Sequence, residues 1–231
     1  MAEYFTLDFL IKVLVLAVPV ILAVTLHEAA HGFVALHYGD DTARRAGRLT
    51  LNPFKHVDPM GTLLIPGVLI FLGSPFIFGY AKPVPVAFER LRNPRLDMVS
   101  VALAGPLTNI VLALVSALLF HVLPFFPESW AAPLAEAFKL SLILNVTLAL
   151  FNMLPLPPLD GGRVAVGLLP DILAMPLAKL ERYGMVIIFG LLFLVPFVTH
   201  KMGHTLSPIA WLLEKPVEGV VRLIARLTGV L

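Results

Sequence analysis

The feature that most limits the fold of this chain is a long apolar run near its N-terminal end, over residues 9–36. An α-helix rises about 1.5 Å per residue, so this run exceeds the roughly 30 Å hydrocarbon core of a bilayer. Further apolar runs cover residues 99–123 and 134–154, and a shorter one covers residues 185–198. The chain is 58% hydrophobic and only 14% charged, with a mean hydropathy of +0.91. We therefore expect an all-α polytopic membrane protein with about four to six apolar segments.

Basic residues indicate how these segments are oriented. The loops at residues 40–59 and 80–97 both carry several Lys and Arg side chains, which favours a cytoplasmic location for both. Two loops on one side require that the apolar segment between them, residues 61–79, does not cross. Its Pro and Gly residues fit a re-entrant element. The N-terminus and residues 121–133 are then expected outside, and residues 155–182 inside.

Charge and cysteine content narrow the classes of function. The net charge is only +2, so the pI of about 9.0 does not indicate a nucleic-acid partner. Cysteine is absent, so a zinc ion would need His and carboxylate ligands. No polar segment is long enough for a separate soluble domain, and we expect one membrane-embedded domain over residues 1–231.

The C-terminal part, residues 200–231, is predicted to be partly amphipathic. Apolar residues recur there at roughly helical spacing, opposite charged ones: Val217, Val220, Val221 and Ile224 against Glu218, Arg222 and Arg226. This pattern favours a helix that lies at the membrane interface.

His27, Glu28 and His31 form a His-Glu-x-x-His motif inside the first apolar run. Residues four apart lie on one face of a helix, so the two imidazoles can hold one zinc ion. Glu28 lies about 100° further round the helix and can act there as a general base on water. A catalytic zinc lowers the pKa of water that it binds to about 7, and it needs a third protein ligand. Ionisable side chains are costly at membrane depth, which argues against a chance match.

Asp160 is the candidate for the third ligand. It follows a run with three prolines, residues 155–158, which favour extended backbone at the end of an apolar segment. Gly161 and Gly162 then permit a tight turn or a close approach of backbone. The alternative is that Asp160 caps a helix beginning at Gly161, a role that does not exclude metal binding.

Together these motifs resemble those of the site-2 protease family of intramembrane zinc metalloproteases, in a compact, prokaryotic-type form without a PDZ domain. The resemblance covers most of residues 20–165 and rests on residues 27–31, 52–59, 82–86, 104–109 and 152–162. It implies that His27, His31 and Asp160 bind zinc and that Glu28 is the general base. It also implies that Asn152 lies near the site, where an amide donor can stabilise a developing oxyanion.

The resemblance further implies a zinc-dependent endopeptidase that cleaves a peptide bond within or near a transmembrane segment of a membrane protein. Its catalytic core is expected over about residues 8–165, with short extended loops near the active site. The expected location is a prokaryotic plasma or inner membrane, with the active site toward the cytoplasm. The expected partners are the lipid bilayer and the substrate.

Two other classes of function stay open at this point. A divalent-metal transporter would need several His or carboxylate sites along a path. A catalytically inactive binding or chaperone subunit would not need the carboxylate of Glu28. Among single residues, Asn152 could instead bond across helices, whereas Gly105 and Asn109 are expected to serve helix packing. Residues 82–87 are expected to be extended, with an edge to which substrate could pair.

Overall fold

The computed structural model describes residues 7–64, 67–68, 82–204 and 206–231. Within these ranges the regular structure is helical, with no strand. Four helical segments are long and apolar enough to cross a membrane: Ala17–His37, Pro94–Phe125, Glu128–Asn152 and Glu181–Lys201. The prediction of an all-α polytopic membrane protein is confirmed. The last of these segments is longer than its apolar run because the helix continues into polar residues at both ends.

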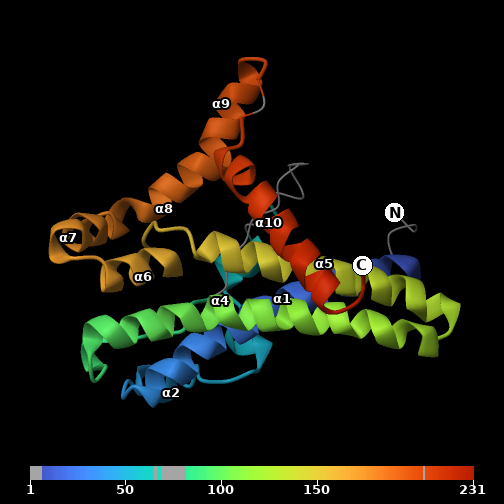
Figure 1. Ribbon diagram of the computed structural model, residues 1–231, viewed down its shortest axis with the longest axis horizontal. Coiled ribbons are helices and arrows are strands. Elements are labelled where there is room, and N and C mark those ends of the chain that lie inside the picture. Colours follow the sequence, from blue (N-terminus) through green and yellow to red (C-terminus); the bar gives the residue numbers. More distant parts are fainter. Residues whose placement is uncertain (1–6, 65–66, 69–81, 205) are drawn as a thin grey trace.

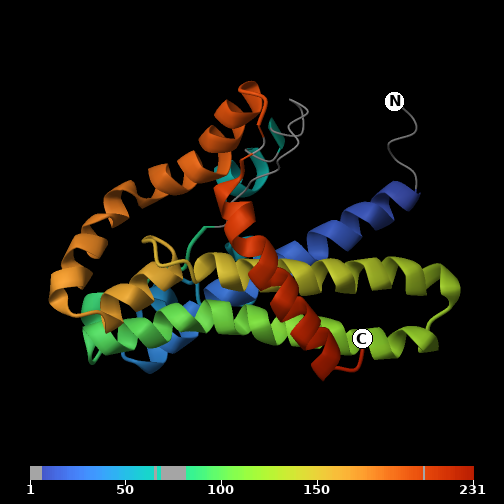
Figure 2. The same cartoon turned by 45° about the horizontal axis from the view of Figure 1, so that its top comes forward.

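Three long helices form the centre of the molecule: α1 (Leu7–His37), α4 (Pro94–Leu118) and α5 (Glu128–Asn152). They lie side by side in both ribbon views (Figures 1 and 2). Small side chains permit this approach, since Ala23 and Ala113 are completely buried. A 3-10 helix, η5 (Leu119–Phe125), prolongs α4.

Short helical turns connect α1 to α4: α2 (Thr42–Arg45), η2 (Pro53–Lys55), the π-helix η3 (Pro59–Leu64) and η4 (Phe88–Arg90). The predicted re-entrant segment, residues 61–79, falls largely outside the described residues. Residues 82–87 carry no helix, in keeping with the expected extended loop.

Asp40 holds this connection against the end of α1. Its carboxylate is fully buried and accepts hydrogen bonds from the backbone N–H groups of Thr42, at 2.9 Å, and Ala87, at 2.7 Å. Burial is the largest influence on the pKa of Asp40 and would raise it. The hydrogen bonds from Thr42 and Ala87 outweigh burial, so the pKa lies below its ordinary value. The carboxylate therefore stabilises the fold at neutral pH, and this contribution disappears as the pH falls through that pKa.

The chain leaves α5 through a proline-rich loop, with a cis peptide bond between Pro157 and Pro158, and enters α6 (Asp160–Leu168). Four consecutive helical elements then extend away from the central helices (Figure 1, orange): α7 (Asp171–Lys179), α8 (Glu181–Phe189), η6 (Gly190–Leu194) and α9 (Val195–Lys201).

The last helix, α10 (Pro208–Leu227), crosses α5 and α4 obliquely (Figures 1 and 2). Its apolar residues pack against those two helices, with Val217, Val220, Val221 and Ile224 meeting Ala113, Ala117, Leu142 and Val146. The sequence favoured a helix at the membrane interface. In the structure the apolar face of α10 contacts protein, because the small residues of α4 leave a surface on which α10 can pack. Its location at the membrane interface stays a prediction.

Candidate metal centre

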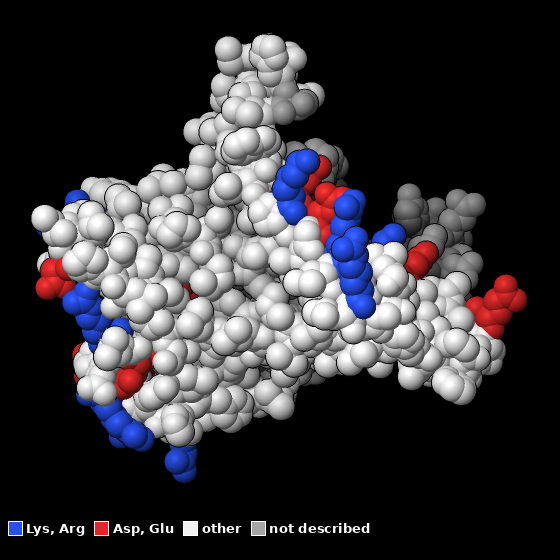
Figure 3. All heavy atoms as spheres, viewed as in Figure 1, with Lys and Arg blue, Asp and Glu red and all other residues white. Residues whose placement is uncertain are grey.

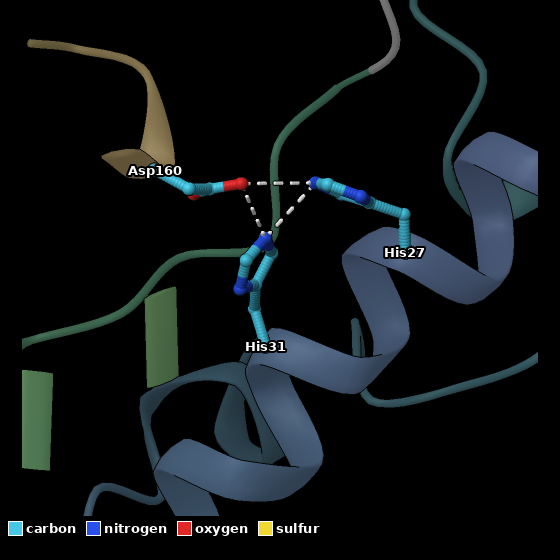
Figure 4. A group of neighbouring side chains, drawn as sticks. All are labelled: His27, His31 and Asp160. Atoms are coloured by element: carbon cyan, nitrogen blue, oxygen red, sulfur yellow. Dashed lines mark hydrogen bonds and ion pairs between the residues drawn. The ribbon is translucent and has the colours of Figure 1, made fainter. Parts of the chain in front are cut away.

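His27, His31 and Asp160 converge on one point (Figure 4). The two imidazoles come from successive turns of α1, and the carboxylate comes from the first residue of α6. The Nε2 atoms of His27 and His31 lie 3.0 Å apart, and Oδ2 of Asp160 lies 3.3 Å and 3.4 Å from them. All three side chains are buried. Among the described residues, no other group of three His or acidic side chains is close enough to share a metal ion.

The protonation of both imidazoles follows from what their Nδ1 atoms contact. Nδ1 of His31 lies 2.7 Å from the carbonyl oxygen of Val101, and Nδ1 of His27 lies 2.6 Å from Oδ1 of Asn109. Both partners are acceptors, so each Nδ1 carries a proton, and in the neutral form of each ring the lone pair is at Nε2.

When neither Nε2 carries a proton, three acceptor atoms face one another. Oδ2 of Asp160 is buried and has no hydrogen-bond partner. Buried polar atoms are ordinarily paired, and two nitrogen lone pairs beside a carboxylate oxygen repel one another. A cation bound among them removes both problems. Two imidazoles and one carboxylate are a donor set that zinc accepts in catalytic sites, so the residues present fit a zinc ion.

A chain of amides fixes the orientation of His27. The carbonyl of Ser141 can only accept, and Nδ2 of Asn145 donates to it at 2.9 Å. Oδ1 of Asn145 is then free to accept from Nδ2 of Asn109, at 2.8 Å. This leaves Oδ1 of Asn109 facing Nδ1 of His27. Backbone on α5 thereby sets the tautomer of an imidazole on α1, through a buried side chain on α4.

Sequence reasoning missed this role of Asn109, which it assigned to packing. The available signal was an amide side chain inside an apolar span, which is costly unless paired. Asn145 carries the same signal in the next span.

Gly105 allows α4 to reach the two imidazoles. A Cβ atom at this position would lie 2.4 Å from Nε2 of His31 and 2.6 Å from Nε2 of His27. Any larger residue would therefore collide with the atoms that face Asp160. Gly105 was expected to serve helix packing, and it does: it lets α4 pack directly against the two imidazoles of the metal centre.

The start of α6 places the carboxylate of Asp160. The helix begins at Asp160 itself, its N-cap residue is Leu159, and no side-chain cap is formed. The capping alternative is therefore wrong, because the side chain points at the imidazoles instead of at backbone N–H groups. A Cβ at Gly161 would lie 2.2 Å from the carbonyl oxygen of Met153, so glycine is needed for the loop to fold back this closely.

Arg95, in the first turn of α4, secures the other end of α6. Its Nε donates to the carbonyl of Gly167 at 3.1 Å, and its Nη2 donates to the carbonyl of Leu169. Its Nη1 pairs with Asp171 at 2.7 Å. Because the last carbonyls of a helix lack partners within it, an arginine is well suited to this position.

Glu28 follows His27 on α1, and its carboxylate contacts the backbone of the segment 82–87. Its Oε2 accepts a hydrogen bond from the backbone N–H of Val84 at 2.8 Å. The side chain of Val84 is buried against Gly32, one turn further along α1. At the start of the same segment, Arg48 donates to the carbonyl of Lys82 at 2.6 Å. Residues 82–87 are thus bonded to the candidate general base through the N–H of Val84.

Asn152 is placed at the end of α5, half-buried, with its Nδ2 donating to the carbonyl of Leu148 at 2.9 Å. Within the described residues, no hydrogen bond joins it to His27, His31 or Asp160. Its implied role near the oxyanion stays a prediction.

We expect Asn109→Ala to weaken zinc binding about 10–100-fold, because loss of an acceptor at Nδ1 frees the tautomer and the rotation of His27. Competition with a zinc chelator measures this affinity. Ser116→Ala is the matched control, since it removes another hydrogen bond between α4 and α5, the part-buried 2.7 Å contact with Ser141. Equal zinc affinity in Asn109→Ala and the wild type would contradict the assigned role.

The sequence of this chain is similar to those of known proteins that are named as zinc metalloproteases. A family model described as "Peptidase family M50" matches residues 125–197. "Putative zinc metalloprotease YwhC" of Bacillus subtilis (strain 168) is 39% identical over 198 residues, which cover 84% of each chain. "Putative zinc metalloprotease Rip2" of Mycobacterium tuberculosis (strain H37Rv) is 31% identical over 91% of this chain and 76% of its own length. No solved structure matches.

Proposed function

Since the chain belongs to peptidase family M50, the site-2 proteases, and is a zinc metalloprotease of the membrane, we propose that it is an intramembrane endopeptidase. Its substrate is a membrane protein, cut at a peptide bond within or near a transmembrane segment. The observation that carries this proposal is the meeting of three buried acceptor atoms, two of which come from α1, a helix that also carries Glu28 and is long enough to cross a bilayer.

His27 and His31, through Nε2, and Asp160, through Oδ2, would hold the zinc ion. When bound, zinc supplies Lewis-acid chemistry, which acidifies water and polarises a peptide carbonyl. The amide chain through Asn109 keeps His27 in the tautomer that binding needs. Gly105 keeps α4 close enough to shield the centre from lipid while leaving the imidazoles in place.

Glu28 accepts the proton of the attacking water and then delivers it to the leaving amine. The N–H of Val84 binds one carboxylate oxygen and restricts the rotation of the side chain, so the other oxygen remains for proton transfer. Asn152 is proposed to donate to the developing oxyanion. This requires its amide to exchange the carbonyl of Leu148 for the substrate.

A helical substrate must unwind before its peptide bond is accessible, because helical backbone groups are already paired and sterically shielded. We propose that unwound substrate pairs with residues 82–87. Pro83 and Pro85 have no N–H, so the substrate has to act mainly as donor there. Two other N–H groups of this segment already have partners. The N–H of Lys82 donates to the carbonyl of His56, and the N–H of Ala87 donates to the carboxylate of Asp40.

The site is proposed to face the cytoplasm in a prokaryotic plasma membrane, within a single domain over residues 1–231. The support is the basic content of residues 40–59 and 80–97, together with the location of His31 in the last turns of α1, next to these loops.

Cleavage in proteoliposomes tests the proposed function. The purified protein and a single-span model substrate are reconstituted together, and products are mapped by mass spectrometry. We expect a cut within or next to the span, complete loss of cutting with a zinc chelator, and recovery on addition of zinc. Zinc flux is followed in the same vesicles.

Cutting confined to soluble peptides would contradict the intramembrane assignment. Zinc flux without cleavage would instead support a transporter. Tight substrate binding with no cleavage under any metal condition would support an inactive binding subunit.

A further inference from the structure

The outer face of α10 carries charge in a region of the molecule that is otherwise apolar. Glu214, Lys215, Glu218, Arg222 and Arg226 are all exposed. Figure 3 shows the charged residues over α10 as a patch in the middle of the uncharged surface, apart from the charges at the ends of the molecule.

This charged face lies at the level of the membrane-spanning helices. The opposite, apolar face of α10 packs on Ala113 and Val146, which lie within the spans Pro94–Phe125 and Glu128–Asn152. Ala113 is 12 residues from the end of its span, or about 18 Å along the helix. Charged side chains at such depth are costly against lipid, and they ordinarily face protein or water. This face of α10 is therefore expected to contact protein or water rather than lipid.

The order of the charges identifies a surface that fits. Glu214, Glu218, Arg222 and Arg226 follow one another at intervals of four residues, so they form one stripe along the helix. The two glutamates come first and the two arginines second, and the exposed Lys215 lies beside Glu214. Where a second copy of the helix crosses at the middle of the stripe, Glu218 of each copy can meet Arg222 of the other, which makes this part of the surface complementary to itself.

The centre of the stripe also permits close approach. A Cβ atom at Gly219 would meet nothing within 4 Å, so the space in front of this residue is open. Leu223, on the same part of the surface, is 55% exposed and offers apolar contact beside the charges. Glycine at a helix crossing is a common feature of membrane interfaces.

We propose that α10 is the contact surface for a second copy of this chain. Two copies with the same membrane orientation are related by an axis along the membrane normal. This axis reverses the direction of the oblique α10 only within the membrane plane, so the two helices cross near Gly219 and bring together the charges beside the crossing. Glu218 of each copy pairs with Arg222 of the other. Within one chain these two residues already form an ion pair, so the contact joins four charges into one network.

Charge reversal in differently tagged copies tests the proposal. Glu218→Arg or Arg222→Glu alone replaces two attractive contacts with two repulsive ones, and we expect co-purification from nanodiscs or mild detergent to fall at least about tenfold. A mixture of one Glu218→Arg copy and one Arg222→Glu copy restores opposite charges across the contact. We expect co-purification of this mixture at the wild-type level.

The mixture separates contact between copies from a role within one helix. Each variant still lacks its own ion pair between residues 218 and 222, so recovery in the mixture can arise only across two chains. Lys179→Glu, at an exposed site on α7, is the matched charge-reversal control. The zinc content of every variant reports that the central helices are folded.

Disulfide cross-linking gives a second readout, since the chain has no cysteine of its own. Gly219→Cys should cross-link to itself under mild oxidation, and Val198→Cys, exposed on α9, should not. A wild-type protein that stays monomeric at bilayer concentrations overturns the proposal. So does failure of the mixture to recover, or cross-linking that depends on an unrelated protein. Each of these outcomes is independent of whether the enzyme cleaves within the membrane.

Discussion

Glu28→Gln should abolish proteolysis and leave zinc binding intact. Glutamine has the shape of glutamate, and its carbonyl oxygen can still accept from the N–H of Val84. It cannot accept a proton from water or return one to the leaving amine. Loss of a general acid and base costs about 10²–10⁴-fold in rate, and we expect kcat to fall by at least the upper part of that range because both proton transfers use one residue.

Zinc content separates this effect from collapse of the site. The carboxylate of Glu28 is not among the three converging atoms, so the variant should hold as much zinc per chain as the wild type. Glu89→Gln is the matched control, since it makes the same exchange at an exposed glutamate in η4 and should retain full activity. Activity in Glu28→Gln within tenfold of the wild type would assign the proton transfer to another group.

Asp160→Ala should lose both zinc and activity. The carboxylate supplies the only negative charge among the three converging atoms, and its removal leaves two neutral imidazoles. Two nitrogen ligands on one helix face form an incomplete catalytic zinc site. We expect the zinc content after dialysis against a weak chelator to fall well below one ion per chain, measured by atomic emission, with cleavage lost in parallel.

The control for this variant is another aspartate that begins a helix. Asp171→Ala replaces the first residue of α7 and removes its exposed ion pair with Arg95. Such a pair contributes about 0–1 kcal/mol to stability. It should keep its zinc. Retention of one tightly held zinc in Asp160→Ala, with activity unchanged, would show that another group completes the metal site.

Local spacing in the sequence was sufficient to predict part of the site. Two histidines four residues apart must share a helix face, and this is how His27 and His31 lie. The prolines before Asp160 and the glycines after it indicated a loop that can approach another helix. They did not show which helix, because spacing within a loop does not say which element the loop meets. Its distance from the imidazoles depends on the packing of α6 against α4, which is secured by Arg95.

The contacts that the sequence did not reveal are those between distant elements. Nothing in the neighbourhood of Asn109 indicates that its oxygen faces His27, because this depends on the rotation of α4 against α1. The bond between Val84 and Glu28 is of the same kind. For α10, the spacing of apolar residues showed that one side would be buried but did not distinguish lipid from protein as its partner.

The three converging atoms come from opposite halves of the chain, so the metal site cannot be complete early in biosynthesis. A nascent chain inserts its first helix, with both imidazoles and Glu28, long before the ribosome has delivered α6. Until the carboxylate of Asp160 docks, the inserted portion has no complete metal site. The metal centre is thus completed only after translation has delivered α6.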